Sequence, residues 1–200
     1  AHPGKNITGL TRLSRDLSGK RLELLTEAVP GISRVGILWG PSVSFSATGR
    51  KPFQDYEAPA HALKIALQIL EVSPPNPDVA GAFRDAVKRR AQAVITITTS
   101  TLVPNDKKIA ELAIKHRLPT MCEAVHYVEA GGLMSYSADD FESFRRAATY
   151  VDKILNGTKP SDLPVEQPKK FEFIVNLKTA KQIGLAIPPN VLASADRVIK

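Results

Sequence analysis

The feature that most constrains the fold is a regular alternation of short apolar runs with amphipathic segments between residues 34 and 122. The apolar runs occupy residues 34–39, 68–72, 93–97 and 118–122. The run at 93–97 consists largely of β-branched residues, which favour strands. Segments of helical period separate the apolar runs, at about 53–67, 78–90 and 105–116. Strand and helix in strict alternation imply right-handed crossovers. We therefore predict an α/β fold with a Rossmann-like parallel sheet and helices on both faces.

The rest of the chain has a different character. A helix is expected over 18–29, and after Gly131-Gly132 we expect a strand at 133–136. A long helix follows over about 141–155, with Asp139 and Asp140 as its cap and Asn156-Gly157 as its stop. Three prolines then punctuate an extended stretch, which we expect to cross between packed units as a hinge strand over 158–170, before a strand at 171–176, a helix at 177–184 and a last short helix after Pro188-Pro189. A lobe followed by an excursion and a return is typical of a hinged two-lobe protein.

Composition narrows the class of function. The formal net charge is +7, but no run of five or six basic residues occurs, so we expect no nucleic-acid partner. The single cysteine, Cys122, excludes an intrachain disulfide and is expected to be a small buried hydrophobe. No stretch has the roughly 18 apolar residues of a membrane span, and the first residues do not look like a signal peptide.

Catalytic and cofactor motifs are missing. Neither glycine-rich phosphate loop occurs, and there is no nucleophile elbow. The four histidines, His2, His61, His116 and His126, are isolated from one another in the sequence, and surface or capping roles are expected for them. We therefore predict no catalytic residues, no metal site and no cofactor.

Uncharged hydroxyls cluster in the loops that follow the predicted strands. These loops contain Ser42, Ser44, Ser46 and Thr48, then Thr98, Thr99, Ser100 and Thr101, and finally Ser135 and Ser137. Ligands bind at the carboxyl edge of an open parallel sheet, where helix N-termini favour anions. These hydroxyls therefore either bind a carboxylate or amide, or only cap helices and solvate loops.

The segment from Glu129 to Lys200 resembles the closing part of one family of ABC transporter substrate-binding proteins, the family that includes the tryptophan and tyrosine importers. The similarity runs through EAGGLMSY (129–136), RRAATYVDKILNG (145–157), PSDLPVEQP (160–168), FEFIVNLKTAK (171–181) and IGLAIPP (183–189). Upstream, GKNITGL (4–10) and KRLELL (20–25) resemble the segment before the family's second lobe. The resemblance covers almost the whole chain.

This resemblance implies a type I periplasmic-binding-protein lobe plus hinge segments. Residues 1–22 would end the first lobe, 23–132 form the C-terminal α/β lobe, 133–163 make an excursion toward the first lobe, and 164–200 return through the hinge. It implies a periplasmic or extracytoplasmic protein whose partners are a small-molecule solute, an ABC permease and a first lobe that lies outside this chain with the export signal.

The expected ligand-binding residues are Ser42, Ser44, Thr99, Ser100, Glu123, Ser135 and Tyr136, with Glu123 facing an ammonium group. Two departures from the family affect this expectation. Trp39-Gly40-Pro41 stands where the family has Trp-Asn-Pro and is followed by a longer loop, and Tyr136 is followed by Ser137-Ala138 in place of Gly-Pro. The contacts of the family's binding loop therefore cannot be transferred position by position.

Three functions remain open. The leading one is a non-enzymatic protein whose two lobes close on an amino acid or related carboxylate and deliver it to a permease. The second is a ligand-sensing module of the same fold that passes its occupancy to a signalling partner. The third is an α/β enzyme whose catalytic half lies in the first lobe.

Overall fold

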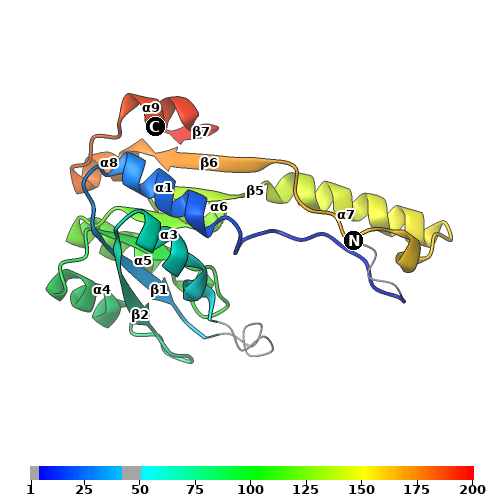
Figure 1. Ribbon diagram of the computed structural model, residues 1–200, viewed down its shortest axis with the longest axis horizontal. Coiled ribbons are helices and arrows are strands. Elements are labelled where there is room, and N and C mark those ends of the chain that lie inside the picture. The colour runs from blue at the N-terminus through cyan, green and yellow to red at the C-terminus, as the bar shows by residue number, and fades with distance from the viewer. Residues whose placement is uncertain (1–4, 42–50) are drawn as a thin grey trace.

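The computed structural model describes residues 5–41 and 51–200. Its centre is a single seven-stranded sheet in the order β2-β1-β3-β4-β5-β6-β7 (Figure 1). The strands are β1 (Arg34–Trp39), β2 (Ala66–Glu71), β3 (Ala93–Thr96), β4 (Thr120–Cys122), β5 (Met134–Ala138), β6 (Phe171–Asn176) and β7 (Arg197–Ile199). Strands β1 to β4 pair in parallel, as predicted, and β5 adds to β4 as a fifth parallel strand. Strand β6 runs antiparallel to β5, and β7 is parallel to β6.

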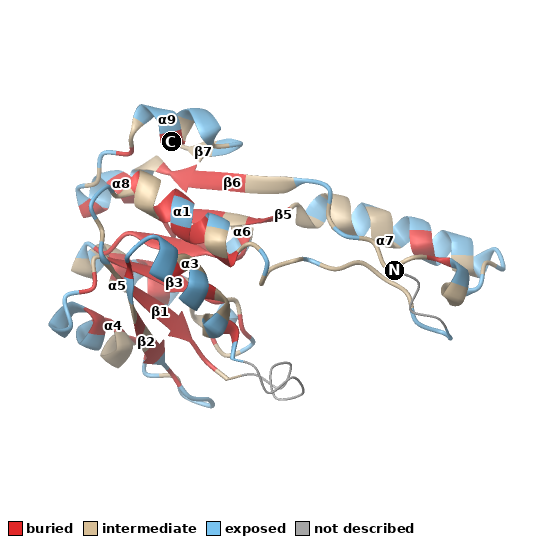
Figure 2. Ribbon diagram, viewed as in Figure 1, coloured by how far each residue is buried: buried red, intermediate tan, exposed pale blue. Residues whose placement is uncertain are grey.

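The helices that cover the sheet separate its core into two clusters. The described α-helices of the chain, with or without contact to the sheet, are α1 (Ser18–Ala28), α3 (Glu57–Ala62), α4 (Val79–Lys88), α5 (Asp106–His116), α6 (Val125–Glu129), α7 (Asp140–Leu155), α8 (Leu177–Ile183) and α9 (Pro189–Ser194). Side chains of α1, α3, α8 and α9 form one cluster with Val35, Ile37 and Trp39 of β1. Those of α4, α5 and α6 form the other with Leu38. Consecutive residues of β1 therefore face opposite sides, as a strand requires, and both faces of the sheet are buried (Figure 2).

A second, thinner part projects from this body. The long helix α7 lies beyond the far ends of β5 and β6, and the N-terminal segment runs toward it (Figure 1). We call α7, together with residues 5–12 and 156–170, the arm. Asp139 caps α7 as predicted, because its side chain accepts a hydrogen bond from the Glu142 amide at 3.1 Å.

The connection after the arm helix differs from the predicted hinge strand. Residues Pro160–Asp162 form a short 3₁₀ helix, and among the described residues the segment pairs only through an isolated parallel bridge between Leu10 and Glu166. The prolines explain this, since a proline has no N–H to give to a sheet ladder.

The helix expected over 53–67 is the clearest error in the local predictions. A 3₁₀ turn at Pro52–Tyr56 leads into α3, which ends at Ala62. Lys64 adopts a left-handed conformation with φ of 57°, and the Ile65 amide donates back to the Ala60 carbonyl at 2.8 Å. This local turn releases Ala66 and Leu67 into β2, so the strand begins two residues before its predicted start. Strand β4 begins two residues later than predicted, while α6 and β7 were not predicted.

Candidate functional site

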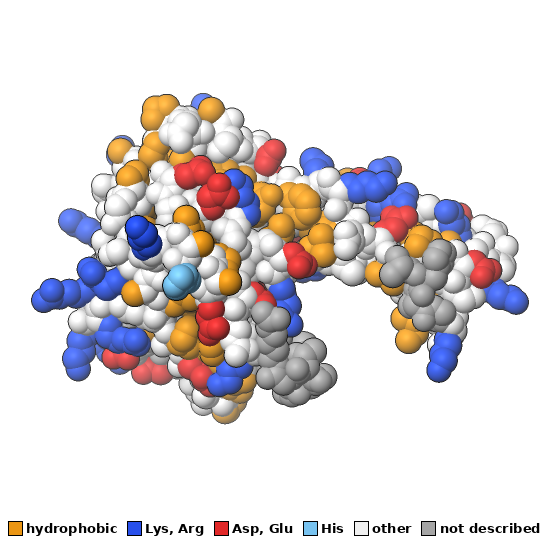
Figure 3. Space-filling view, in the orientation of Figure 1, with side chains coloured by type: hydrophobic (Ala, Val, Ile, Leu, Met, Phe, Trp, Pro, Cys, Tyr) orange, Lys and Arg blue, Asp and Glu red, His pale blue; other side chains and the backbone are white. Residues whose placement is uncertain are grey.

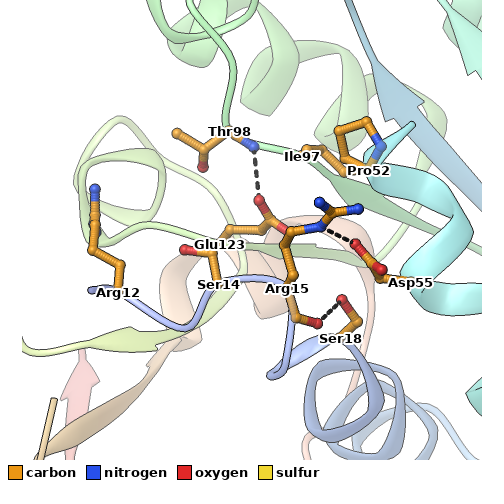
Figure 4. A pocket seen from close by; sticks show the side chains of 9 residues that line it. All are labelled: Arg12, Ser14, Arg15, Ser18, Pro52, Asp55, Ile97, Thr98 and Glu123. Atoms are coloured by element: carbon orange, nitrogen blue, oxygen red, sulfur yellow. Dashed lines mark hydrogen bonds and ion pairs between the residues drawn. The ribbon is translucent and has the colours of Figure 1, made fainter. Parts of the chain in front are cut away.

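A polar pocket lies where the carboxyl ends of β3 and β4 meet the segment that precedes α1. Its volume is about 220 Å³, and its lining residues are Arg12, Ser14, Arg15, Ser18, Pro52, Asp55, Ile97, Thr98 and Glu123 (Figure 4). Thr98 follows β3 and Glu123 follows β4, which places both at the sheet edge where α/β proteins bind ligands. The opposite wall comes from Arg12 to Ser18 and from the 3₁₀ turn.

Glu123 is the most constrained side chain of the pocket. Its Oε1 accepts hydrogen bonds from Arg21 Nη1 at 3.2 Å and from the Tyr56 hydroxyl at 3.1 Å. Its Oε2 accepts from the Thr98 amide at 3.2 Å. Burial raises the pKa of this carboxyl group above its usual value, and Arg21, the Thr98 amide and Tyr56 act against that rise. Both oxygens therefore already have partners within the protein.

The other charged groups of the pocket are also paired. Arg15 Nε donates to Asp55 Oδ2 at 2.5 Å, and Arg12 Nη2 lies 2.7 Å from the carboxylate of Asp140, the first residue of α7. Arg15 nevertheless keeps donor capacity, because its Nη2 is buried without a hydrogen-bond partner in the described protein. The pocket thus contains two arginines and two carboxylates, together with serine and threonine hydroxyls. This mixture suits a small polar molecule that carries both a positive and a negative group.

Of the five predicted site residues that the structure describes, one lies at this pocket. Glu123 lines it, whereas Thr99, Ser100, Ser135 and Tyr136 do not. Ser42 and Ser44 lie outside the described residues.

Thr99 and Ser100 lie in the loop that follows β3. The Thr99 hydroxyl accepts a hydrogen bond from the Leu102 amide at 3.3 Å, which caps the turn that leads to α5. Ser100 is exposed. The sequence left open whether these hydroxyls bind a ligand or cap local structure, and the structure shows a capping hydrogen bond for Thr99.

Ser135 and Tyr136 lie in β5, where the chain leaves the body. The Ser135 hydroxyl is buried without a partner among the described residues. The ring of Tyr136 stacks on Phe171 of β6, with centroids 6.1 Å apart, and its carbonyl accepts from Arg21 Nε at 2.8 Å.

Sequence reasoning missed Arg15 and the central role of Arg21. The helix over 18–29 is predicted from three leucines and Val29. In the structure Ser18, Arg21, Leu25 and Ala28 share a face at helical spacing, and all four are buried. The signal available in the sequence was that Arg21 falls on the same helical face as Leu25 and Ala28. For Arg15 the sequence offered no such pattern.

Among residues 5–41 and 51–200, no group of three or more His, Cys, Asp or Glu side chains could hold a metal ion. Within the same ranges, no helix is long and apolar enough to cross a bilayer. Cys122, beside Glu123, is buried, and burial raises the pKa of its thiol to about 12.

Solved structures share this fold. A conserved domain protein from Vibrio cholerae matches with a TM-score of 0.85 and 26% identity, over 98% of this chain and 64% of that one. An ABC domain from Streptococcus pneumoniae, crystallised with L-Trp, matches with a TM-score of 0.81 and 24% identity, over 99% and 66%. An open, ligand-free substrate-binding protein from Clostridium difficile matches with a TM-score of 0.73 and 22% identity, over 100% and 64%.

The chain thus spans about two thirds of the length of these proteins. A comparison with curated proteins gives no match. The sequence model of the ABC transporter substrate binding proteins matches residues 1–199. The chain therefore belongs to the ABC transporter substrate-binding protein family.

Proposed function

We propose that the chain is the solute-binding part of an ABC importer, which takes a small molecule between two lobes and hands it to a permease without changing it. The observation that carries this proposal is the pocket at the carboxyl edge of β3 and β4, beside the segments through which the chain enters and leaves the body. Membership of the family supports the role in import. Because the solute-binding protein of an importer meets its solute outside the cytoplasm, the proposal also implies an extracytoplasmic location.

The solute we propose is an amino acid or a related carboxylate. Arg15 has a buried Nη2 without a partner in the described protein, and a guanidinium binds carboxylates well. The similar protein from Streptococcus pneumoniae was crystallised with L-Trp. Glu123, which we expected to face the ammonium group, would have to share its oxygens with Arg21, Tyr56 and Thr98.

The arm supports a two-lobe arrangement. Helix α7 exposes a row of apolar side chains at helical spacing, namely Phe141 (81% exposed), Phe144 (75%), Val151 (55%) and Leu155 (81%). Figure 3 shows hydrophobic side chains at the surface of the arm as well as on the body. A soluble protein seldom leaves such a row uncovered. In our proposal the family's first lobe packs on it, so residues 23–132 belong to the second lobe, 133–163 reach the first and 164–200 return.

The test is calorimetric titration of the full-length protein with a panel of amino acids that includes L-Trp. In Arg15→Ala we expect the affinity for the best ligand to fall ten- to a hundredfold, because a charge-assisted hydrogen bond is worth roughly 1.5 to 3 kcal/mol. Thr98→Val removes one hydroxyl of the pocket without a change in shape, and we expect a roughly threefold to tenfold loss.

Thr149→Val is the matched control, because Thr149 is exposed on α7 and donates only to the Arg145 carbonyl. We expect it to bind like the wild type. Equal affinities for all three variants would place the solute elsewhere, and release of an altered ligand after incubation would indicate an enzyme.

A further inference from the structure

Arg21 occupies an unusual position for a charged side chain. It lies in α1 and is 0% exposed, so its charge is fully removed from solvent. Burial of an unpaired charge is strongly unfavourable. The side chain must therefore have strong partners, and the identity of those partners shows what it does.

Three groups that accept hydrogen bonds from Arg21 come from three different parts of the chain, and the Tyr56 hydroxyl also lies beside its guanidinium. Nη1 donates to the Ser14 carbonyl at 2.5 Å, in the segment through which the chain enters the body from the arm. Nε donates to the Tyr136 carbonyl at 2.8 Å, in the strand through which the chain leaves for the arm. Nη1 also donates to Glu123 at 3.2 Å. One rigid, planar group therefore holds both segments through which the chain passes between the body and the arm. We call these segments, residues 11–15 and β5, the crossing segments.

We call Arg21 and its hydrogen bonds to Ser14 and Tyr136 the clamp. The third acceptor, Glu123, joins the clamp to the pocket. Glu123 and Ser14 both line the pocket, and the carboxylate of Glu123 also accepts from the Thr98 amide after β3. A movement of the entering segment at Ser14 would therefore change a hydrogen bond that ends in the pocket wall, and a movement at Tyr136 would act on the same guanidinium that holds Glu123.

Spare hydrogen-bonding capacity gathers in the same two crossing segments. Within the described part of the chain, eight buried side-chain atoms have no hydrogen-bond partner. Four of them belong to these segments, namely Thr11 Oγ1, Arg15 Nη2, Ser135 Oγ and Ser137 Oγ, and a fifth is Nη2 of Arg21 itself. Buried polar groups are normally paired, so this local excess fits a region that changes partners when the arm moves relative to the body.

We propose that Arg21 is a positioning residue that sets the resting angle between the arm and the body and, through Glu123, ties that angle to the wall of the pocket. The clamp rests only on the contacts of the unliganded chain. Its regulatory meaning rests on the proposed function, because Glu123 lines the proposed solute site. A ligand that draws on Glu123 would weaken the hold on both crossing segments and shift the population of angles.

A purely structural role for Arg21 would also lower stability when it is lost, so the test must read the angle directly. Spin labels at Lys88→Cys in α4 and Lys153→Cys in α7, both exposed positions, report the distance from body to arm in the ligand-free, full-length protein. The native Cys122 is buried and is replaced by serine to avoid background labelling.

In Arg21→Lys the charge opposite Glu123 is kept, but a single ammonium cannot replace the forked donors. We expect its distance distribution to be roughly twice as wide as that of the wild type, or to move to a new mean. Tyr56→Phe is the matched control, because the Tyr56 hydroxyl donates to the same carboxylate but comes from the 3₁₀ turn before α3, outside the crossing segments. It should lose stability and keep the wild-type distribution.

A wild-type distribution in Arg21→Lys would overturn the proposal, whatever the change in stability. If that variant does not fold, the neutral double variant Arg21→Gln with Glu123→Gln takes its place under the same criteria. Glu123→Gln alone should widen the distribution less than Arg21→Lys, and an unchanged distribution there would overturn the link to the pocket. Because no ligand is used, failure here is distinct from failure of the amino-acid titration.

Discussion

The guanidinium of Arg146 and the carboxylate of Glu166 meet side by side in the arm, with Nη2 to Oε1 at 2.5 Å and Nε to Oε2 at 3.1 Å. The backbone of Glu166 also pairs with the N-terminal segment, since its amide donates to the Gly9 carbonyl and its carbonyl accepts from the Thr11 amide. One residue therefore holds α7 and the entering segment together. Arg146 lowers the pKa of this carboxyl group below its usual value.

The lowered pKa of Glu166 predicts a pH-dependent contribution to stability. A carboxyl group with a depressed pKa in the folded state stabilises the fold above its unfolded pKa, and the contribution is lost as pH falls through the folded value. Glu166→Gln should cost about 1 kcal/mol near neutral pH, as for a well-formed, partly exposed pair. Denaturant titrations of both proteins should show this difference shrink in acid, and a difference that persists there would refute the ionic contribution.

Phe144 tests whether another lobe covers the arm. Phe144→Ser should change the unfolding free energy of chain 1–200 by less than about 0.5 kcal/mol, because the side chain is exposed there. In the full-length protein the same change should cost roughly 3 kcal/mol, as for a buried aromatic ring. Thr149→Ser on the same helix is the control and should be neutral in both. Equal effects of Phe144→Ser in the two proteins would mean that nothing packs on this face.

Gly132 lies against the buried ring of Tyr127, so a side chain there has no room. The ring cannot move aside easily, because its hydroxyl donates to Thr120 Oγ1 at 2.9 Å. Gly132→Ala should therefore destabilise the protein by about 1 to 3 kcal/mol. Gly19→Ala in α1 meets only ordinary contacts with Pro59 and should be neutral or stabilising. Thermal unfolding of the two alanine variants, measured side by side, separates steric overlap from a general effect of losing glycine.

Cys122 should be inert in the folded protein. Its thiol is buried, and the raised pKa of about 12 leaves almost no thiolate at neutral or mildly alkaline pH. Titration with a disulfide reagent near pH 8 should therefore show no rapid reaction before denaturant is added and one thiol per chain afterwards. Rapid modification of the native protein would show that the region around β4 opens readily.

The parts of the fold that the sequence predicted are those governed by local patterns. The strand at 34–39 and the helix stop at Leu155 followed from β-branched runs and from Asn156-Gly157, and the structure confirms both. The end of α3 could not be predicted, because it depends on a left-handed Lys64, a residue with no special preference for that conformation.

The candidate site was predicted less well, for a related reason. Glu123 could be placed at the sheet edge because it follows a strand, but its partner Arg21 is 102 positions away. The wall formed by Ser14 and Arg15 comes from a segment whose position depends on the arm. Long-range partners of this kind leave no periodic pattern in the sequence.

The antiparallel pairing of β5 with β6 means that the larger part of the arm, residues 140–170, is an insertion between neighbouring strands. Ala138 and Phe171 are register partners at the point where the arm begins and ends, so the two ends of the insertion are as close as residues of a hairpin. A two-residue turn of the Asn-Gly type could join such ends. Replacing residues 139–170 by such a turn would leave the strand order of the body unchanged, so the topology of the sheet does not depend on the insertion.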